Sequence, residues 1–360
     1  MTSSLLSLGL MSGTSLDGVD AALIRTDGER VQEFGACLTR PYPEPLRDRL
    51  RGVLGGVGAV ADVEREMTLF HAEVVEALLD DSAISRADIS VIGFHGHTIL
   101  HRPDQGQTWQ IGDGALLAAR SGIAVVNDFR TNDVAAGGQG APLVPIYHVA
   151  LADALVRPLA ILNLGGVGNV TWIGEDGDLL AFDTGPGNAL IDDWLLSHTG
   201  RPVDLDGALA QTGQIDGDAL RAFQGHPYFA KYPPKSLDRD DFAKFAGRLV
   251  GGLSLADGAA TLGAFTCAAV DLARTHFPAP PQRWLVCGGG RHNPFLMEGL
   301  RRRVDAPVDP VDAVGWDGDA LEAQAFAFLA VRSLKGLPLT WPGTTGVARP
   351  LGGGRVHRPD

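Results

Sequence analysis

The chain has 360 residues, 45% of them apolar, and its 30 Lys and Arg residues are outnumbered by 43 Asp and Glu residues, for a formal charge of -13. This length and composition allow a sizeable buried core and make two domains the natural expectation. The negative charge repels polyphosphate backbones and argues against a nucleic-acid partner.

The sequence has no early basic segment followed by an apolar run and no uninterrupted apolar stretch of about 18 residues, so neither export nor membrane spanning is predicted. Its three cysteines, Cys37, Cys267 and Cys287, are odd in number and widely spaced. This pattern fits reduced thiols better than a disulfide framework, and none of the three has the neighbours of a zinc site. A cytoplasmic location is therefore expected.

Hydrophobic periodicity and turn residues predict the elements of the first half. They are strands at 4–10, 19–25 and 30–38, a helix at 62–80, and a strand at 88–96 that ends in a glycine turn. The first two strands flank "GLMSGTSLDGVD", residues 9–20, which combines three glycines with a Ser-Gly-Thr-Ser run and two aspartates. This loop therefore joins strand to strand.

A second glycine-rich turn lies about 155 positions further along the chain. The segment "LAILNLGGVGNVTWIG" (159–174) again predicts strand, turn and strand, and "LLAFDTGPGN" (179–188) follows it. The two halves thus begin alike, although two ordinary glycine-rich hairpins would give the same pattern. Further on, "WLVCGGGRHNPFLMEGL" (284–300) predicts a strand, three glycines and a helix with Asn293 and Pro294 in its first turn, and a last helix is predicted over 318–334.

The first loop carries groups that suit phosphate binding. Glycine lets backbone N–H groups approach an anion closely, Ser and Thr add donors, and a carboxylate can hold the magnesium that accompanies ATP. This set is supplied by Gly13, Thr14, Ser15 and Asp17. The loop has neither the Gly-Lys-Ser/Thr of a Walker motif nor the strand-turn-helix context of a dinucleotide fingerprint. The three glycines at 288–290 would offer a nucleotide a flat surface beside helix-terminal amides, or simply connect a strand to a helix.

A transition-metal site is the alternative use of the histidines His95, His97 and His101. The first two would share one face of a strand, and imidazoles bind zinc well. No carboxylate or cysteine nearby in the sequence completes a ligand set, so magnesium delivered with ATP is the expected metal.

Seven segments carry a more specific signal. They are "GLMSGTSLDGVDAAL", "FHGHTILHRP", "WQIGDGALLAARSGIAVVNDFR", "AAGGQGAPLVP", "FDTGPGNALIDDW", "CGGGRHNPFLM" and "DALEAQAFAFLA". Together they resemble the anhydro-N-acetylmuramic acid kinase family of the hexokinase, Hsp70 and actin superfamily, from about residue 8 to residue 353. The resemblance implies an α/β, two-lobed, actin-like ATPase (ribonuclease H-like) fold with mixed sheets and an interlobe cleft for ATP and Mg2+. The lobes would be 1–128, completed by about 343–360, and 129–342, and the family suggests a homodimer.

The resemblance also implies the reaction. Such kinases open the 1,6-anhydro ring of 1,6-anhydro-N-acetylmuramic acid with water and phosphorylate O6, in recycling of cell-wall peptidoglycan. Asp183 matches the family's catalytic aspartate, a base that takes a proton from the attacking water while the γ-phosphoryl group captures O6. Judged from the sequence alone, Asp183 could also be a turn or helix-capping residue. Asp192 and Asp193 are expected on an exposed helix face.

The other matched positions fall into two groups. The phosphate loops and the adenosine-binding motif would be Gly13, Thr14, Ser15, Asp17, Gly18, Asn163, Gly165, Gly166, Gly168, Asn169, Gly288, Gly289, Gly290 and Asn293, with Asp17 also holding the Mg2+ of ATP. The sugar would contact Gly96, Arg130 and Glu322, and Arg130 suits the lactyl carboxylate because its planar fork makes paired hydrogen bonds. The chain departs from the family at His97, where many relatives have Gln, and at Leu237 and Asp238, which replace a Thr-Gly pair.

Two other functions stay open from the residues alone. An ordinary sugar kinase of the same fold would use Asp183 to deprotonate a substrate hydroxyl without ring opening. A nucleotide-dependent binding protein of the actin or Hsp70 kind would turn over ATP to change shape. Dependence of ATP consumption on an added small sugar distinguishes the kinases from the binding protein.

Overall fold

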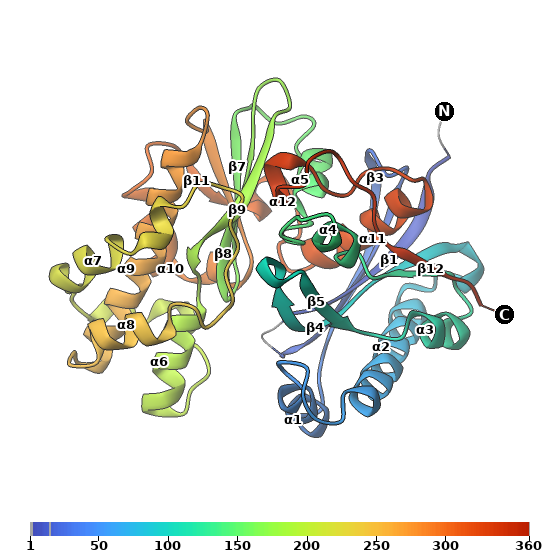
Figure 1. Ribbon diagram of the computed structural model, residues 1–360, viewed down its shortest axis with the longest axis horizontal. Coiled ribbons are helices and arrows are strands. Elements are labelled where there is room, and N and C mark those ends of the chain that lie inside the picture. The colour runs from blue at the N-terminus through green and yellow to red at the C-terminus, as the bar shows by residue number, and fades with distance from the viewer. Residues whose placement is uncertain (1–2, 14–15, 360) are drawn as a thin grey trace. The chain divides into compact units, whose positions relative to one another are not determined.

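The computed structural model describes residues 3–13 and 16–359. Contacts divide the chain into two compact units: a first unit of Met1–Asp153 with Ala320–Asp360, and a second unit of Ala154–Asp319 (Figure 1). Each unit contains one sheet with both parallel and antiparallel strand pairs, flanked by helices. The predicted α/β class with mixed sheets is therefore confirmed.

The first unit has a seven-stranded sheet. Its strands are β1 (Leu5–Ser12), β2 (Gly18–Thr26), β3 (Val31–Pro41), β4 (Ile89–Arg102), β5 (Gln107–Ile111), β6 (Val125–Asn127) and β12 (Arg355–His357). Their order is β12-β6-β4-β1-β2-β3, with β5 paired to β4. β1, β2 and β3 run antiparallel, whereas β4 is parallel to both β1 and β6. The three predicted N-terminal strands are confirmed, and the predicted loop joins β1 to β2.

β4 is longer than the strand predicted at 88–96. It continues through the expected glycine turn and pairs with β5 over its second half. Gly96 has a φ of +73°, and a Cβ atom there would lie only 2.3 Å from the carbonyl oxygen of Ile111. The glycine thus lets two strands pass close together, and the prediction that β4 ends at this turn is wrong.

Helices cover both faces of the first sheet (Figure 1). They are α1 (Glu44–Gly52), α2 (Val60–Ser82), α3 (Gly114–Ser121), α4 (Thr131–Ala135), α5 (Pro145–Leu151), α11 (Leu321–Leu334) and α12 (Pro342–Thr345). The predicted helix at 62–80 is confirmed as α2, which shares a hydrophobic cluster with Leu8 and Leu10 of β1. Because alternate strand residues point to opposite faces, Gly9 between them faces α11.

α11 lies directly on the backbone of this sheet. A Cβ atom on Gly9 would be 1.8 Å from the Ala323 carbonyl oxygen, and one on Gly93 would be 2.0 Å from that of Phe326. Glycine is therefore required at both strand positions. This packing assigns α11 to the first unit, so the observed division after Asp153 and Asp319 differs from the sequence-based boundaries after residues 128 and 342.

The second unit has a five-stranded sheet of order β11-β10-β7-β8-β9. Its elements are β7 (Leu159–Leu164), β8 (Val167–Ile173), β9 (Leu179–Pro186), α6 (Ala189–Thr199), α7 (Gly217–Gln224), α8 (Ala243–Val250), α9 (Leu255–Ala273), β10 (Arg283–Cys287), α10 (Pro294–Arg301) and β11 (Val308–Pro310). The order and directions match those of β6-β4-β1-β2-β3 in the first unit. The similarity predicted between the two halves therefore extends to their topology.

α9 is the central helix of the second unit. The segment Leu255–His276 is long and apolar enough to cross a membrane by length and composition, and 72% of its most apolar window is buried within the protein. Its side chains share a hydrophobic cluster with Phe182 and Phe223. A buried core helix passes the same test as a membrane span, so the apolar segment is weak evidence for a membrane.

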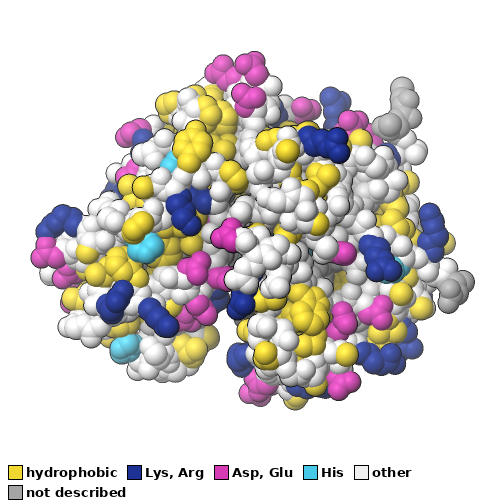
Figure 2. All heavy atoms as spheres, in the orientation of Figure 1, with side chains coloured by type: hydrophobic (Ala, Val, Ile, Leu, Met, Phe, Trp, Pro, Cys, Tyr) yellow, Lys and Arg dark blue, Asp and Glu magenta, His cyan; other side chains and the backbone are white. Residues whose placement is uncertain are grey.

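Charged side chains lie on the surface in mixed order. On the face drawn in Figure 2, Lys and Arg side chains are interspersed with Asp and Glu side chains. Several form local ion pairs, such as Arg49 with Glu66 and Arg86 with Glu76. Exposed pairs of this kind contribute about 0–1 kcal/mol each, so packing of the two cores supplies most of the stability.

Candidate functional site

Buried polar contacts hold the first glycine-rich loop. The Tyr42 hydroxyl donates to Ser12 Oγ at 2.8 Å, and Ser12 Oγ lies 2.9 Å from His97 Nδ1. The Tyr42 backbone N–H donates to the carbonyl oxygen of Asp17 at 3.1 Å. Residues from β1, β4 and the end of β3 thereby fix both ends of the loop. Burial lowers the pKa of His97 to about 4, so its imidazole is neutral in this network.

The predicted phosphate-binding residues of this loop differ in their surroundings. The Asp17 side chain is exposed. A Cβ atom on Gly18 would lie 2.4 Å from the Arg40 carbonyl oxygen, so this glycine is required by packing of β2 on β3. Gly13 accepts a hydrogen bond from the Leu16 N–H at 3.1 Å. Thr14 and Ser15 lie outside the described residues.

The predicted sugar contacts in the first unit centre on Arg130. Its Nη1 donates to the Gly140 carbonyl oxygen at 2.8 Å, and its Nη2 lies 3.0 Å from His95 Nε2. Because a guanidinium has no acceptor, His95 Nε2 must accept this hydrogen bond. Burial and the Arg130 charge lower the pKa of His95, which keeps the ring neutral. The arginine is therefore oriented in advance; Gly96 follows His95 on β4, and Glu322 lies half-buried in the first turn of α11.

The second glycine-rich turn is tied to the start of α6. The Asn188 N–H donates to the Gly165 carbonyl oxygen at 2.8 Å, and the Gly187 N–H donates to that of Gly166 at 2.9 Å. A Cβ atom on Gly187 would lie 2.2 Å from the Gly165 carbonyl oxygen. The turn between β7 and β8 and the segment after β9 therefore pack backbone to backbone.

The glycines that follow β10 meet the same turn. A Cβ atom on Gly290 would lie 2.5 Å from Leu164 Cβ, and one on Gly288, whose φ is +74°, would lie 2.3 Å from Asn163 Oδ1. Asn188 Nδ2 donates to the Leu164 carbonyl oxygen at 2.9 Å. The structure thus brings together two predicted nucleotide-binding segments that are far apart in the sequence.

Three glycines in this region have no packing reason to be glycine. Among the described residues, a Cβ atom on Gly165, Gly166 or Gly289 would approach its nearest neighbour at 3.7, 3.7 and 4.0 Å respectively, which is ordinary van der Waals contact or more. None of the three has a positive φ. By contrast, Gly168 is crowded, because its Cβ atom would lie 2.7 Å from Thr184 Oγ1. The three uncrowded glycines leave bare backbone that a ligand could approach closely.

Asp183 lies in a row of polar residues that crosses the second sheet. Asn163 of β7 pairs with Asn169 of β8, and Asn169 pairs with Asp183 of β9. Directly paired residues share a face of the sheet, so the three side chains lie on one side. The Leu237 N–H donates to Asp183 Oδ2 at 2.8 Å, which orients the carboxylate. Asp183 is therefore a held strand residue, and the alternative of a helix cap is wrong.

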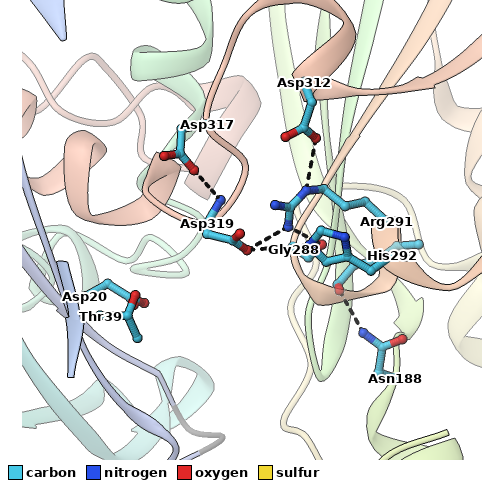
Figure 3. A network of polar contacts seen from close by, with 10 residues as sticks. Asp20, Thr39, Asn188, Gly288, Arg291, His292, Asp312, Asp317 and Asp319 are labelled. Carbon is cyan, nitrogen blue, oxygen red and sulfur yellow. Dashed lines mark hydrogen bonds and ion pairs between the residues drawn. The ribbon is translucent and has the colours of Figure 1, made fainter. Parts of the chain in front are cut away.

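A buried arginine network flanks the Gly288–Gly290 segment (Figure 3). Arg291 donates to Asp312 at 3.1 Å, to Asp319 at 2.8 Å and to the Gly288 carbonyl oxygen at 3.2 Å. Figure 3 shows both carboxylates directed at the guanidinium. In the next turn, Asn293 Oδ1 accepts the N–H groups of Phe295 and Leu296, so this predicted nucleotide-binding residue caps α10. The network fixes the glycine segment against the chain that follows β11.

Sequence reasoning missed a second charged pair. Arg239 donates to both carboxylate oxygens of Asp193, at 2.7 and 2.9 Å, and also contacts Asp240. Burial raises the pKa of Asp192 to about 7, although the Arg239 charge opposes this shift. Both aspartates are partly buried, so the expected exposed helix face is wrong. No spacing in the sequence could have paired residues 193 and 239.

Asp17 is the residue predicted to bind the Mg2+ of ATP. Within residues 3–13 and 16–359, no group of three or more His, Cys, Asp or Glu side chains could hold a metal ion. The exposed carboxylate of Asp17 is an oxygen ligand of the kind Mg2+ takes, and Mg2+ in kinases is bound by one or two carboxylates together with substrate phosphates. The residues present therefore fit a magnesium ion that arrives with a nucleotide.

Comparisons with known proteins cover nearly the whole chain. The profile of the family described as anhydro-N-acetylmuramic acid kinase matches residues 5–358. A protein of that name from Paramagnetospirillum magneticum is 65% identical over 355 residues, which are 99% of this chain and 100% of the relative. Another from Rhodospirillum rubrum is 63% identical, over 96% of this chain and 92% of the relative. Among solved structures, the activator of 2-hydroxyisocaproyl-CoA dehydratase from Clostridium difficile, with bound ADPNP, matches 92% of this chain and 96% of its own at 12% identity and a TM-score of 0.49.

Proposed function

This chain belongs to the anhydro-N-acetylmuramic acid kinase family, and from that premise we propose that it opens the 1,6-anhydro ring of 1,6-anhydro-N-acetylmuramic acid with water and phosphorylates O6. ATP is the phosphoryl donor, and the products are N-acetylmuramic acid 6-phosphate and ADP. The enzyme is a kinase of this family, and ring opening is the step that distinguishes it from an ordinary sugar kinase.

One observation carries the proposal. The uncrowded backbone of Gly165, Gly166 and Gly289 lies in the same unit as the polar row that ends at Asp183. Bare glycine backbone suits close approach of phosphates and a nucleoside, because N–H groups can contact them without interference from side chains. A held carboxylate suits a general base. The second unit therefore carries both a nucleotide surface and a base.

Asp183 performs the proton transfer in this proposal. It removes one proton from the water whose oxygen bonds to C1 of the sugar, and the C1–O6 bond breaks at the same time. O6 then forms its bond to the γ-phosphorus as the bond to ADP breaks, so no further oxidant or reductant is needed. The hydrogen bond from the Leu237 N–H to Oδ2 holds the carboxylate in one orientation.

Residues of the first unit serve the sugar and the phosphates. Arg130, oriented by Gly140 and His95, pairs with the lactyl carboxylate, while Glu322 and Gly96 contact the sugar ring. Asp17 holds the Mg2+ of ATP, which supplies charge neutralisation on the phosphates. Thr14 and Ser15 complete the first phosphate loop. We further propose that the enzyme works in the cytoplasm, in peptidoglycan recycling, as a homodimer.

An ATP-coupled assay tests the proposal directly. The purified enzyme is given 1,6-anhydro-N-acetylmuramic acid, N-acetylmuramic acid or N-acetylglucosamine with MgATP. We expect sugar-dependent ADP formation that is fastest with the anhydro sugar. Preference for either opened sugar would contradict ring opening, and ADP formation that is independent of sugar would indicate a nucleotide-dependent binding protein.

A further inference from the structure

Lys235 is a buried cation in the second unit, and the proposed reaction gives it no role. Its side chain is 6% exposed. The Nζ atom lies 4.6 Å from the ring centroid of Tyr228 and 5.4 Å from that of Phe182, within the range of cation–π attraction. It also donates to the Tyr228 carbonyl oxygen at 3.3 Å and lies 3.3 Å from His276 Nε2. Burying an ammonium is costly unless it is paired, so these contacts must hold it in one position.

The backbone around Lys235 also contacts Asp183, at two different groups. The Asp183 N–H donates to the Lys235 carbonyl oxygen at 3.1 Å, and the Leu237 N–H donates to Asp183 Oδ2 at 2.8 Å. We call residues 235–237 the strap. The Leu237 side chain packs against the hydrophobic cluster of the second unit and anchors the far end of the strap.

A set of contacts through Tyr228 links the Lys235 ammonium to the backbone of Asp183. The Tyr228 hydroxyl donates to the Asp183 carbonyl oxygen at 2.6 Å, and the Tyr228 carbonyl oxygen accepts from Lys235 Nζ. Lys235 therefore contacts Asp183 through its own backbone on one side and through Tyr228 on the other. Loss of the ammonium would remove the hydrogen bond to Tyr228 and with it the contact that ties the Lys235 side chain to this set.

We propose that Lys235 is a positioning residue for Asp183, which fixes the strap so that the Leu237 N–H presents the carboxylate of the base to its substrate. The inference rests on the proposed role of Asp183. It predicts that Lys235 affects the chemical step and not the binding of ATP or sugar, because the residue contacts the supports of the base.

The ionisation of Lys235 gives this role a pH signature. The pKa of Lys235 is lowered to about 8, chiefly by burial and also by the Lys231 charge, while the Asp183 charge opposes the shift. Burial lowers the pKa of the neighbouring His276 and raises that of Tyr228, so both are neutral near pH 8. Lys235 is thus charged below about pH 8 and neutral above it. Turnover should fall as pH rises through this value.

The test uses steady-state kinetics with MgATP and 1,6-anhydro-N-acetylmuramic acid. It compares the full chain with four variants: Lys235→Met, Lys231→Met, Lys235→Arg and Asp183→Asn. Lys235→Met keeps an unbranched apolar side chain between the two rings but removes the charge, and should lower kcat about 10-fold to 100-fold with both KM values within about threefold of the wild type. Lys231→Met is the matched control, since Lys231 is exposed four residues away, and should keep the wild-type kcat at pH 7. Lys235→Arg retains a cation that stacks on aromatic rings and should restore most of kcat.

The pH profile provides the second readout. The fall in wild-type kcat near pH 8 should be missing in Lys235→Arg, because arginine keeps its proton far above this pH. This comparison decides the matter even if Lys235→Met fails to fold. A Lys235→Met kcat within twofold of the wild type, or an unchanged alkaline fall in Lys235→Arg, would overturn the inference.

Asp183→Asn separates the two proposals. If it retains near wild-type kcat, Asp183 is not the base and the proposed function itself fails. If it loses about a hundredfold or more while Lys235→Met is unaffected, the proposed function stands and the role of Lys235 is refuted.

Discussion

At the scale of single residues, glycine has two different meanings in this chain. Gly9, Gly93, Gly187 and Gly290 are crowded by backbone or side-chain atoms and are needed for packing. Gly165, Gly166 and Gly289 are not crowded by the described residues, so packing does not require glycine there, and in the proposed function the nucleotide approaches their bare backbone. A glycine in these motifs can be needed for packing or can be proposed to contact a ligand, and the sequence alone does not distinguish the two.

Arg130 tests the assignment of the sugar-binding residues. Arg130→Ala should raise the KM for the anhydro sugar about 10-fold or more, because a charge-assisted pair with the lactyl carboxylate contributes roughly 1.5–3 kcal/mol. The KM for ATP should change much less. Arg120→Ala, which removes an exposed arginine of α3, is the control and should leave both constants unchanged. Equal increases for both substrates would instead assign Arg130 a structural role through His95 and Gly140.

At the scale of secondary structure, local patterns predicted most elements. The alternation of apolar residues gave β1, β2 and β3, helical spacing gave α2, and glycine-rich turns between apolar runs gave the β7–β8 hairpin. The end of β4 was mispredicted because glycine is a typical turn residue. Gly96 instead lies within β4, where the lack of a side chain allows β5 to approach closely. Glycine is required at position 96 because of the contact with Ile111, which local sequence does not reveal.

Long-range contacts explain what the sequence left open around the site. The hydrogen bond of Leu237 to Asp183 and the ion pair of Arg239 with Asp193 each join residues about fifty positions apart. Neither follows from spacing or periodicity, which report on neighbours within a few turns. The candidate motifs could therefore be identified from sequence as a prediction, whereas the groups that contact Asp183 and Asp193 could not.

The contact of α11 with the first sheet gives a prediction at this scale. Gly93→Ala would place a Cβ atom 2.0 Å from the Phe326 carbonyl oxygen, and should lower the free energy of unfolding by about 1–3 kcal/mol or more through overpacking. Gly52→Ala at the end of α1 is the control, since a Cβ atom there would meet none of the described atoms within 4 Å, and should change stability by less than about 0.5 kcal/mol. Urea unfolding compares the two. Equal stability of both variants would contradict the packing described for α11.

At the scale of the whole molecule, the two units share a topology, but the buried histidines lie in the first unit. The first unit buries a set of histidines whose pKa values are lowered by burial: His71, His97 and His101 to about 4, His148 to about 3, and His95 also below its ordinary value. The unfolded chain binds protons on these rings below about pH 6.5, whereas the folded chain does not. These histidines therefore do not reduce the free energy of unfolding above about pH 6.5, and they reduce it progressively as pH falls towards 4.

Urea unfolding at pH 7 and pH 5 tests this acid sensitivity. Each fully buried histidine should cost about 2 kcal/mol of unfolding free energy over this interval. His71→Phe, which keeps a ring beside Phe94, should reduce the loss by about that amount, and exchange of the exposed His198 for Gln should not. Stability that stays constant from pH 7 to pH 5 would mean that these rings are protonated in the folded protein.

Ring opening by water is the central claim, and oxygen labelling measures it most directly. The reaction is run in heavy-oxygen water with 1,6-anhydro-N-acetylmuramic acid and MgATP, product is collected at early times, and unlabelled product soaked in the same water corrects for slow exchange at the reducing end. If Asp183 activates water to attack C1 while O6 leaves towards phosphorus, the label appears at C1 and is missing from the bridging oxygen of the phosphate ester. Early product without label at C1 would contradict the account.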